Sequence, residues 1–168
     1  MVLYDERGNF IVGAELALAT RKARQIKNER RLQRPPAAMD EARNIVLGSH
    51  STAQLRSLNS HYNCMGMVFA SRRTCIDTEE LGMILEDDGY RPVVSENDIM
   101  LGDIVVYRNM KGDAVHVGMV AGIRTNLVEG RQEIVVMSQW GGDGEYLHRA
   151  DDVSPLLGVP SEYWTDRT

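Results

Sequence analysis

The sequence predicts an α+β fold in which N-terminal helices pack on one side of a C-terminal antiparallel β-sheet. Three observations lead to this prediction. Helix-favouring segments with clear start and stop residues fill the chain to about residue 90, and beyond it Val and Ile dominate segments separated by turn residues. The length of 168 residues and the 43% hydrophobic content suit one globular domain with an ordinary core.

The first expected elements are a short hairpin and a long helix. Residues 2–12 have the pattern of two apolar strand segments around a polar turn. Residues 14–32 are rich in Ala, Leu, Arg and Lys and contain no Gly or Pro, which favours a helix. Pro35 and Pro36 then terminate that helix.

Two further helices are expected next. Residues 39–47 carry Asp40 and Glu41 in the positive first turn and are followed by Gly48, a residue common just after a helix. Residues 51–58 begin with Ser and Thr, either of which can cap a third helix.

The middle of the chain predicts two short helices. Asn63 is in position to cap a helix that Cys64 opens and that ends near Arg73. Asp77 leads a second helix that reaches about Leu85. Cys64 is therefore expected in the first turn of a helix.

Four segments in the last part of the chain predict a meander of antiparallel strands. They are rich in β-branched residues and are separated by turn sequences such as Asn-Met-Lys-Gly-Asp. The expected strands are residues 103–107, 114–123, 132–140 and 145–149.

Together these elements suggest a helical extension, residues 1–59, joined to a core, residues 60–168, in a single compact domain. Apolar runs are far shorter than the roughly 20 residues that span a bilayer, so no membrane span is expected. The chain opens without a basic segment followed by an apolar one, which predicts a cytoplasmic protein or one exported without a signal peptide. Cys64 and Cys75 are then expected to be free thiols.

Cys64 is the candidate nucleophile. A thiol at a helix N-terminus feels the helix dipole and nearby N–H groups, which favour the thiolate and lower the thiol pKa. The alternative is an inert buried cysteine, which is common in protein cores. Cys75 fits that alternative better, because it follows the end of the same helix, where the dipole disfavours an anion.

A cysteine nucleophile needs a base, and His116 is the best placed of the four histidines. It interrupts an apolar strand, where a polar side chain must find a partner or lose about 1 to 3 kcal/mol. A satisfied structural histidine explains the same pattern. Because Cys64 opens a helix upstream, we expect His116 to be the catalytic base.

The residue that orients the imidazole is expected on the next strand. Ser138 and Gln139 lie near its end, and strand alternation places them on opposite faces, so only one can meet His116. Gln139 is preferred for its reach and its carbonyl acceptor, and Ser138 is the alternative. A third interpretation is that both are ordinary strand-end polar residues.

This order of motifs resembles the NlpC-type papain-like cysteine peptidases and the related CHAP amidases. In those families a Cys opens a helix, a Gly-Asp-aliphatic strand follows, and a His-Val-Gly strand supplies the base. The resemblance spans about residues 60 to 150 and implies a papain-like fold. The segments that carry it are Asn63-Cys64-Met65-Gly66, Leu101-Gly102-Asp103-Ile104, His116-Val117-Gly118 and Ser138-Gln139-Trp140-Gly141.

The chain departs from the family pattern at several positions. Asn63 and Met65 stand where Asp and Ser are usual, Leu101 replaces a Pro, and the third site position is not the usual His. These departures leave Cys64 and His116 in place but weaken the transfer of the family's usual substrate, the stem peptides of peptidoglycan.

The resemblance implies a hydrolase that attacks an amide bond of a peptide or protein with the Cys64 thiolate. His116 would act as base and then as acid, and Gln139 would hold its ring. Deamidation and acyl transfer begin with the same step. The oxyanion is expected to bind the Cys64 backbone N–H, assisted by a group just upstream. The candidates for that group are Asn59, Tyr62 and Asn63.

No cofactor or metal is expected, because the His and Cys residues show no ligand spacing. Residues 1–34 carry eight Lys/Arg against four Asp/Glu, whereas residues 35–168 carry eleven against twenty. The basic stretch 21–34 could attract nucleic acid or an anionic membrane. A helix docked on the acidic remainder is preferred, because the stretch has no aromatic residue for base stacking. A noncatalytic module that binds a peptide or partner is the alternative to an enzyme.

Overall fold

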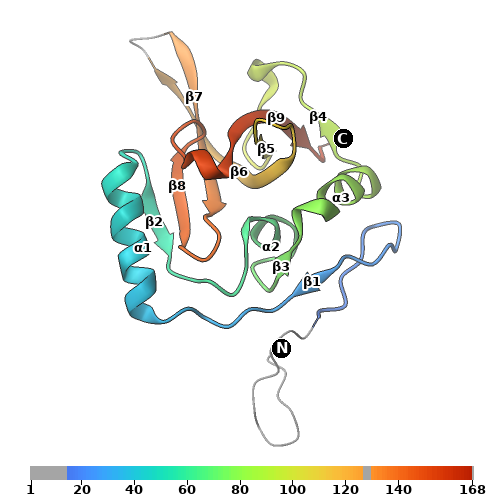
Figure 1. Ribbon diagram of the computed structural model, residues 1–168. Helices are drawn as coiled ribbons and strands as arrows, with labels where there is room; N and C mark the ends of the chain where they lie inside the picture. The colour runs from blue at the N-terminus through green and yellow to red at the C-terminus, as the bar shows by residue number, and fades with distance from the viewer. Residues whose placement is uncertain (1–14, 127–129, 168) are drawn as a thin grey trace, which may run out of the picture.

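A seven-stranded antiparallel sheet forms the centre of the computed structural model, which describes residues 15–126 and 130–167 (Figure 1). The strand order is β2-β8-β7-β6-β5-β9-β4. The strands are β2 (Gln54–Ser57), β4 (Arg91–Pro92), β5 (Ile104–Arg108), β6 (Ala114–Asn126), β7 (Arg131–Gln139), β8 (Glu145–Arg149) and β9 (Val159–Thr165). The predicted α+β class is confirmed.

Four consecutive strands, β5 to β8, lie side by side and confirm the predicted meander. The sequence did not indicate β2, β4 and β9. Each depends on pairing with a strand distant in sequence, and a Pro inside β4 and another inside β9 obscure the pattern. The hairpin expected over residues 2–12 lies outside the described residues.

Within the described ranges, three α-helices accompany the sheet, namely α1 (Pro36–Ser49), α2 (Cys64–Phe69) and α3 (Leu81–Asp87). Single 3-10 turns are η1 (Thr78–Glu80), η2 (Glu96–Asp98) and η3 (Pro155–Leu157). The predicted helices over 39–47, from Asn63 and from Asp77 are thus confirmed with shifted ends. Pro36 begins α1 rather than terminating an earlier helix, because its fixed φ suits the first helical position.

The helix expected over residues 51–58 is wrong. Residues 54–57 form β2, which pairs with β8 and closes one edge of the sheet. The stretch before residue 60 is therefore part of the same sheet and not only a helical extension.

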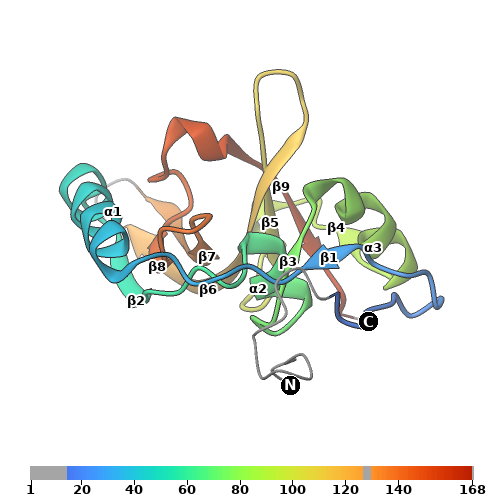
Figure 2. The same cartoon turned by 60° about the horizontal axis from the view of Figure 1, so that its bottom comes forward.

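The helix expected over residues 14–32 is also wrong. Residues 15–35 form an extended segment, called the strap below, that crosses the molecule below β3 and α2 (Figures 1 and 2). Ala23 has a φ of +62°, and the short strand β1 (Asn28–Glu29) pairs with β3 (Cys75–Ile76). Helix propensities differ by only a few tenths of a kcal/mol per residue, so these long-range pairings decide the conformation.

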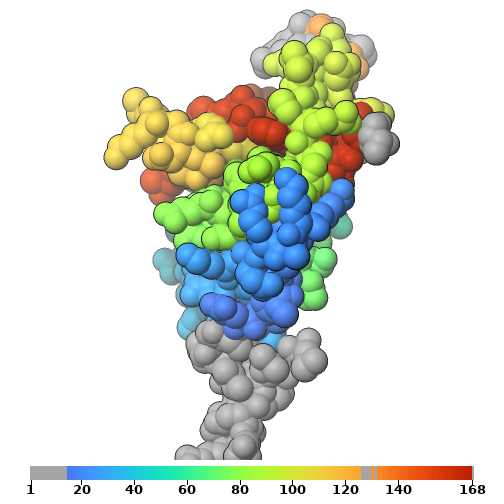
Figure 3. Space-filling view, turned by 90° about the vertical axis from the view of Figure 1, so that its right-hand side faces the viewer, coloured from blue at the N-terminus to red at the C-terminus, as the bar shows by residue number. Residues whose placement is uncertain are grey.

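The basic side chains of the strap meet acidic residues elsewhere on the chain. Arg24 binds Asp87, whose side chain has no exposed surface, and this pairing holds the pKa of that carboxyl well below its usual range. Arg21 pairs with Asp166 and Arg34 with Asp143. Figure 3 shows the blue strap packed against the green segment that contains α3. These contacts show the basic segment docked on acidic residues, as preferred from the sequence, although the segment is extended and not helical.

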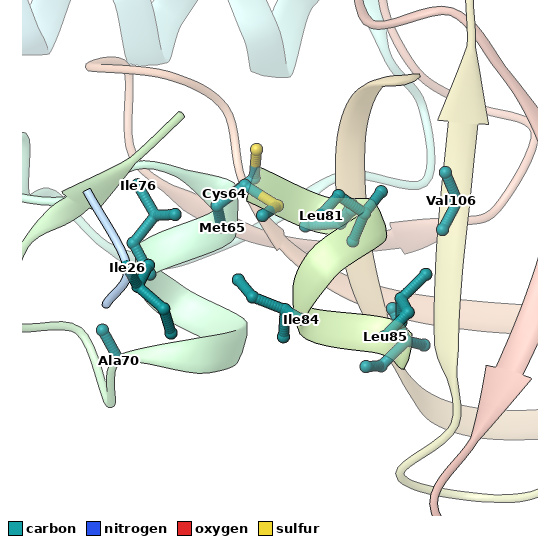
Figure 4. Close-up of a cluster of buried hydrophobic side chains, with 11 residues drawn as sticks. Ile26, Cys64, Met65, Ala70, Ile76, Leu81, Ile84, Leu85 and Val106 are labelled. Carbon is teal, nitrogen blue, oxygen red and sulfur yellow. The ribbon is translucent and has the colours of Figure 1, made fainter. Parts of the chain in front are cut away.

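The register of the strands assigns two different faces to the sheet. Val106 pairs with Val117, and both belong to an apolar cluster with Cys64 and residues of α3 (Figure 4). We call this side the helix face. Tyr107 pairs with His116 on the opposite side, which we call the histidine face.

Helices cover both faces, which corrects the expectation that all would lie on one side. Helix α1 packs on the histidine face, where Val46 contacts Tyr146 in a second apolar cluster. No helix in the described part of the chain is long and apolar enough to cross a membrane.

Candidate active site

Cys64 is the first residue of α2, and Asn63 caps that helix as predicted. The Asn63 Oδ1 accepts hydrogen bonds from the backbone N–H groups of Gly66, at 2.9 Å, and Ile76, at 3.1 Å. A Cβ on Gly66 would lie 1.7 Å from the carbonyl oxygen of Thr74. Only glycine permits this close approach, which fixes the position of the cysteine.

The Cys64 sulfur lies among backbone donors but is almost fully buried. Cys64 is only 6% exposed, and this burial raises the pKa of its thiol. The nearby backbone N–H groups of Val117, Met65 and Cys64 itself favour the thiolate and so act in the opposite direction, but burial outweighs them. The lowered pKa expected from the helix start is therefore not what the structure has: Cys64 rests as a neutral thiol.

His116 precedes Val117 in β6, and the Val117 backbone N–H is the part of that strand that lies near the Cys64 sulfur. Its imidazole is on the histidine face, with its ring centroid 5.1 Å from that of Tyr107. Burial, with a smaller contribution from the nearby His148, lowers the pKa of His116 to about 3. The Nε2 atom is buried without a hydrogen-bond partner among the described residues.

Gln139 is on the other face from His116. It pairs with Glu145, whose carboxylate binds Arg72 and Tyr62 on the helix face. The Gln139 Nε2 donates to the carbonyl oxygens of Asn59, at 2.6 Å, and Gly141, at 2.8 Å. The amide therefore anchors the loop before Cys64, and the register brings the alternative residue, Ser138, to the face of His116.

The three residues considered for oxyanion binding are engaged elsewhere. The Asn59 Oδ1 accepts from the His61 N–H at 2.8 Å, and the Tyr62 hydroxyl donates to Glu145 at 3.1 Å. Asn63 is occupied by its capping bonds and by donation to the Ile76 carbonyl at 2.7 Å. The backbone donors around the Cys64 sulfur are left as the groups that can hold an oxyanion.

Cys75 lies in a cleft of 390 Å³ between the strap and β3. Burial raises the pKa of its thiol, and the Arg31 charge partly opposes this. Its sulfur contacts the His61 carbonyl oxygen at 3.7 Å. Asn63 also lines this cleft, whereas Cys64 does not.

His148 belongs to the polar cluster on the histidine face, and the sequence reasoning missed it. Its Nε2 is 2.8 Å from the Ser138 Oγ, and its Nδ1 is 2.7 Å from the Arg149 carbonyl oxygen. Trp140 Nε1 donates to the same Ser138 oxygen at 3.0 Å. Two-residue alternation from Tyr146 along the predicted strand 145–149 was the available signal, because it assigns His148 to a buried face.

Comparison with known proteins adds no further assignment: no family model, no curated protein and no solved structure matches the chain. Within the described residues, no group of three or more His, Cys, Asp or Glu is arranged to hold a metal ion.

Proposed function

We propose that this protein is a cysteine-dependent hydrolase or acyltransferase of papain-like type that acts on an amide bond of a peptide or protein. One observation carries the proposal. The backbone N–H of Val117 lies near enough to the Cys64 sulfur to favour its thiolate, so the candidate nucleophile sits against β6 at the residue after the candidate base, His116.

The burial of both groups favours a neutral resting pair rather than a thiolate–imidazolium pair. The pKa of Cys64 is raised and that of His116 is lowered to about 3, so the proton stays on sulfur until a substrate binds. On this proposal, substrate binding brings the His116 ring from the histidine face to the sulfur beside Val117, and the thiol proton moves to His116 as the sulfur attacks the carbonyl carbon.

The reaction follows as two balanced acyl-transfer steps. In the first, the sulfur–carbon bond forms, the carbon–nitrogen bond breaks, and His116 gives the thiol proton to the leaving amine. In the second, water attacks the thioester carbon and gives a proton to His116, the carbon–oxygen bond forms, and the carbon–sulfur bond breaks. The carboxylic acid leaves, and the proton returns from His116 to the Cys64 sulfur. Backbone N–H groups around the sulfur would hold the oxyanion in both steps.

The NlpC and CHAP resemblance supports the substrate class at the level of an amide bond. It adds peptidoglycan peptides as one substrate to try. The same first step would serve a deamidase or a transacylase, so the acceptor, water or an amine, is to be found by experiment.

Reaction with p-nitrophenyl acetate tests the nucleophile without knowledge of the natural substrate. We expect release of p-nitrophenolate and an acetyl thioester on Cys64, located by peptide mass spectrometry. Cys64→Ala should abolish this reaction, and His116→Gln should slow it by about 100- to 10,000-fold.

Cys75→Ala is the matched control, because Cys75 is the other buried free thiol. It should react within about twofold of the wild type, a range small against the about 100-fold scale of acid–base effects. Full reactivity of a folded Cys64→Ala variant would overturn the proposal and leave the noncatalytic binding module.

A further inference from the structure

We infer that His148 is a positioning residue that fixes the His116 ring through the hydroxyl group of Ser138. This inference rests on the proposed role of His116 as base. His148 and Ser138 do not touch the reacting sulfur; they determine which imidazole nitrogen of His116 carries its hydrogen.

The direction of the hydrogen bonds begins at the Arg149 carbonyl oxygen, which can only accept. The His148 Nδ1, 2.7 Å away, must therefore carry the hydrogen. Burial lowers the pKa of His148 to about 4, so the ring is neutral near pH 7 and its Nε2 offers a lone pair. At 2.8 Å from that nitrogen, the Ser138 hydroxyl must be the donor.

The Ser138 oxygen then has one free acceptor position. A hydroxyl group has one hydrogen and two lone pairs. The hydrogen is directed to His148, and one lone pair accepts the Trp140 indole N–H at 3.0 Å. The remaining lone pair can accept a hydrogen bond but the hydroxyl has no second hydrogen to give.

His116 supplies the missing donor. Its buried Nε2 has no partner among the described residues, and it shares the histidine face with Ser138. Gly118 lies between them on that face, where a Cβ would approach the Ser138 Cβ to 3.2 Å and Val136 Cγ1 to 2.3 Å. Because Gly118 has no side chain, the Val136 methyl group and Ser138 pack directly over its backbone, beside His116 on the same face.

The consequence is a fixed tautomer. In the inferred arrangement the His116 Nε2–H donates to Ser138, and Nδ1 keeps the lone pair that would receive the Cys64 proton. His116 Nε2 has no partner among the described residues in the resting structure, and catalytic hydrogen bonds often tighten only when substrate binds. When the proton moves from sulfur to Nδ1, Ser138 and His148 keep their own hydrogens.

The test compares His148→Phe, which removes the acceptor of the Ser138 hydroxyl, with His148→Gln, which restores an acceptor. We expect the kcat of acyl transfer from p-nitrophenyl acetate to fall about 10- to 100-fold in His148→Phe with little change in KM, and to recover in part in His148→Gln. His50→Phe is the matched control, since His50 also contacts the Trp140 ring, at 4.9 Å, but is held by Asp152.

Ser138→Ala should reproduce the loss, and the double variant with His148→Phe should lose no more than either alone. Equal activity of folded His148→Phe and wild type, or a full sum of the two losses, would overturn the inference.

A nitrogen NMR spectrum of the His116 ring gives a readout that does not depend on activity. In the wild type we expect the hydrogen on Nε2, and in Ser138→Ala a mixture of tautomers. A wild-type ring with its hydrogen on Nδ1 would refute the inference even if Cys64 is the nucleophile. Conversely, an Nε2–H tautomer with an active Cys64→Ala variant would refute only the proposed function.

Discussion

The two faces of the central sheet are built from the same strands but surround Cys64 and His116 with different groups. On the helix face, Ile104, Val106 and Val117 pack with α2 and α3 around an apolar cluster. On the histidine face, His116 and His148 are almost fully buried among aromatic rings and a serine. Alternation along each strand separates an apolar core from a buried polar network only one residue apart.

This difference separates the environment of the proposed nucleophile from that of the proposed base. The Cys64 sulfur belongs to the apolar cluster, yet it reaches the backbone of β6 at Val117. The imidazole of His116 belongs to the polar network. Apolar packing therefore positions the sulfur, whereas the buried Nε2 of the His116 ring has no hydrogen-bond partner among the described residues.

The largest expected effect on the free energy of unfolding comes from a substitution in α2, which packs on the helix face. In Gly66→Ala the new Cβ would meet the Thr74 carbonyl oxygen at 1.7 Å, a backbone atom that cannot move aside. We expect the free energy of unfolding, measured by urea titration, to fall by about 3 kcal/mol or more. Gly82→Ala is the control, because nothing lies within 4 Å of its Cβ in α3, and it should stabilise by up to about 1 kcal/mol. Equal effects of the two substitutions would contradict this account of α2.

The effect of intermediate size is a pH dependence of folding stability that arises from the histidine face and not from the helix face. The folded pKa values of His116 and His148 are about 3 and about 4, below the ordinary value near 6.5. Their neutral forms stabilise the fold fully above about pH 6.5, and this contribution is lost as pH falls toward 4.

Urea titrations between pH 7 and pH 4 should show stability falling by about 1 kcal/mol or more per pH unit. The slope should flatten in His148→Gln, whereas Ile84→Ala on the helix face should lower stability by about 2 to 5 kcal/mol at every pH. A slope unchanged in His148→Gln would place the titrating groups elsewhere.

The smallest expected effect lies outside both faces. An ion pair joins Arg34 of the strap to Asp143 between β7 and β8, but the two side chains are 42% and 43% exposed. Arg34→Ala should therefore change the free energy of unfolding by at most about 1 kcal/mol, and less in high salt. A larger loss, measured by the same titration, would mean that the strap contributes to the sheet through Arg34.

Local sequence patterns predicted the elements whose signals lie within a few residues. The Asn63 cap of α2, the Asp77 start before α3 and the meander β5 to β8 all follow from neighbouring residues. The strap, β2 and β9 could not be predicted in this way, because their backbone groups bond to partners far along the chain.

The same distinction between local and long-range signals applies to the residues of the candidate site. The sequence singled out Cys64 and His116, and strand alternation alone shows that Ser138 and Gln139 cannot share a face. It could not show which of them faces His116, nor that His148 stands behind Ser138, because both depend on register between strands. The direction of the Cys64 pKa shift was missed for a related reason: helix position is local, but burial by α3 and β6 is not.

The sequence by itself determined the α+β class, the helix that Cys64 opens and the alternation that makes His116 a buried polar residue, because each depends on contacts within a few residues. Only the tertiary structure decided the extended strap, the neutral state of the thiol and the chain of hydrogen bonds from Arg149 to Ser138. The physical reason is that propensities of a few tenths of a kcal/mol per residue are outweighed by long-range pairing and burial, which no local pattern contains.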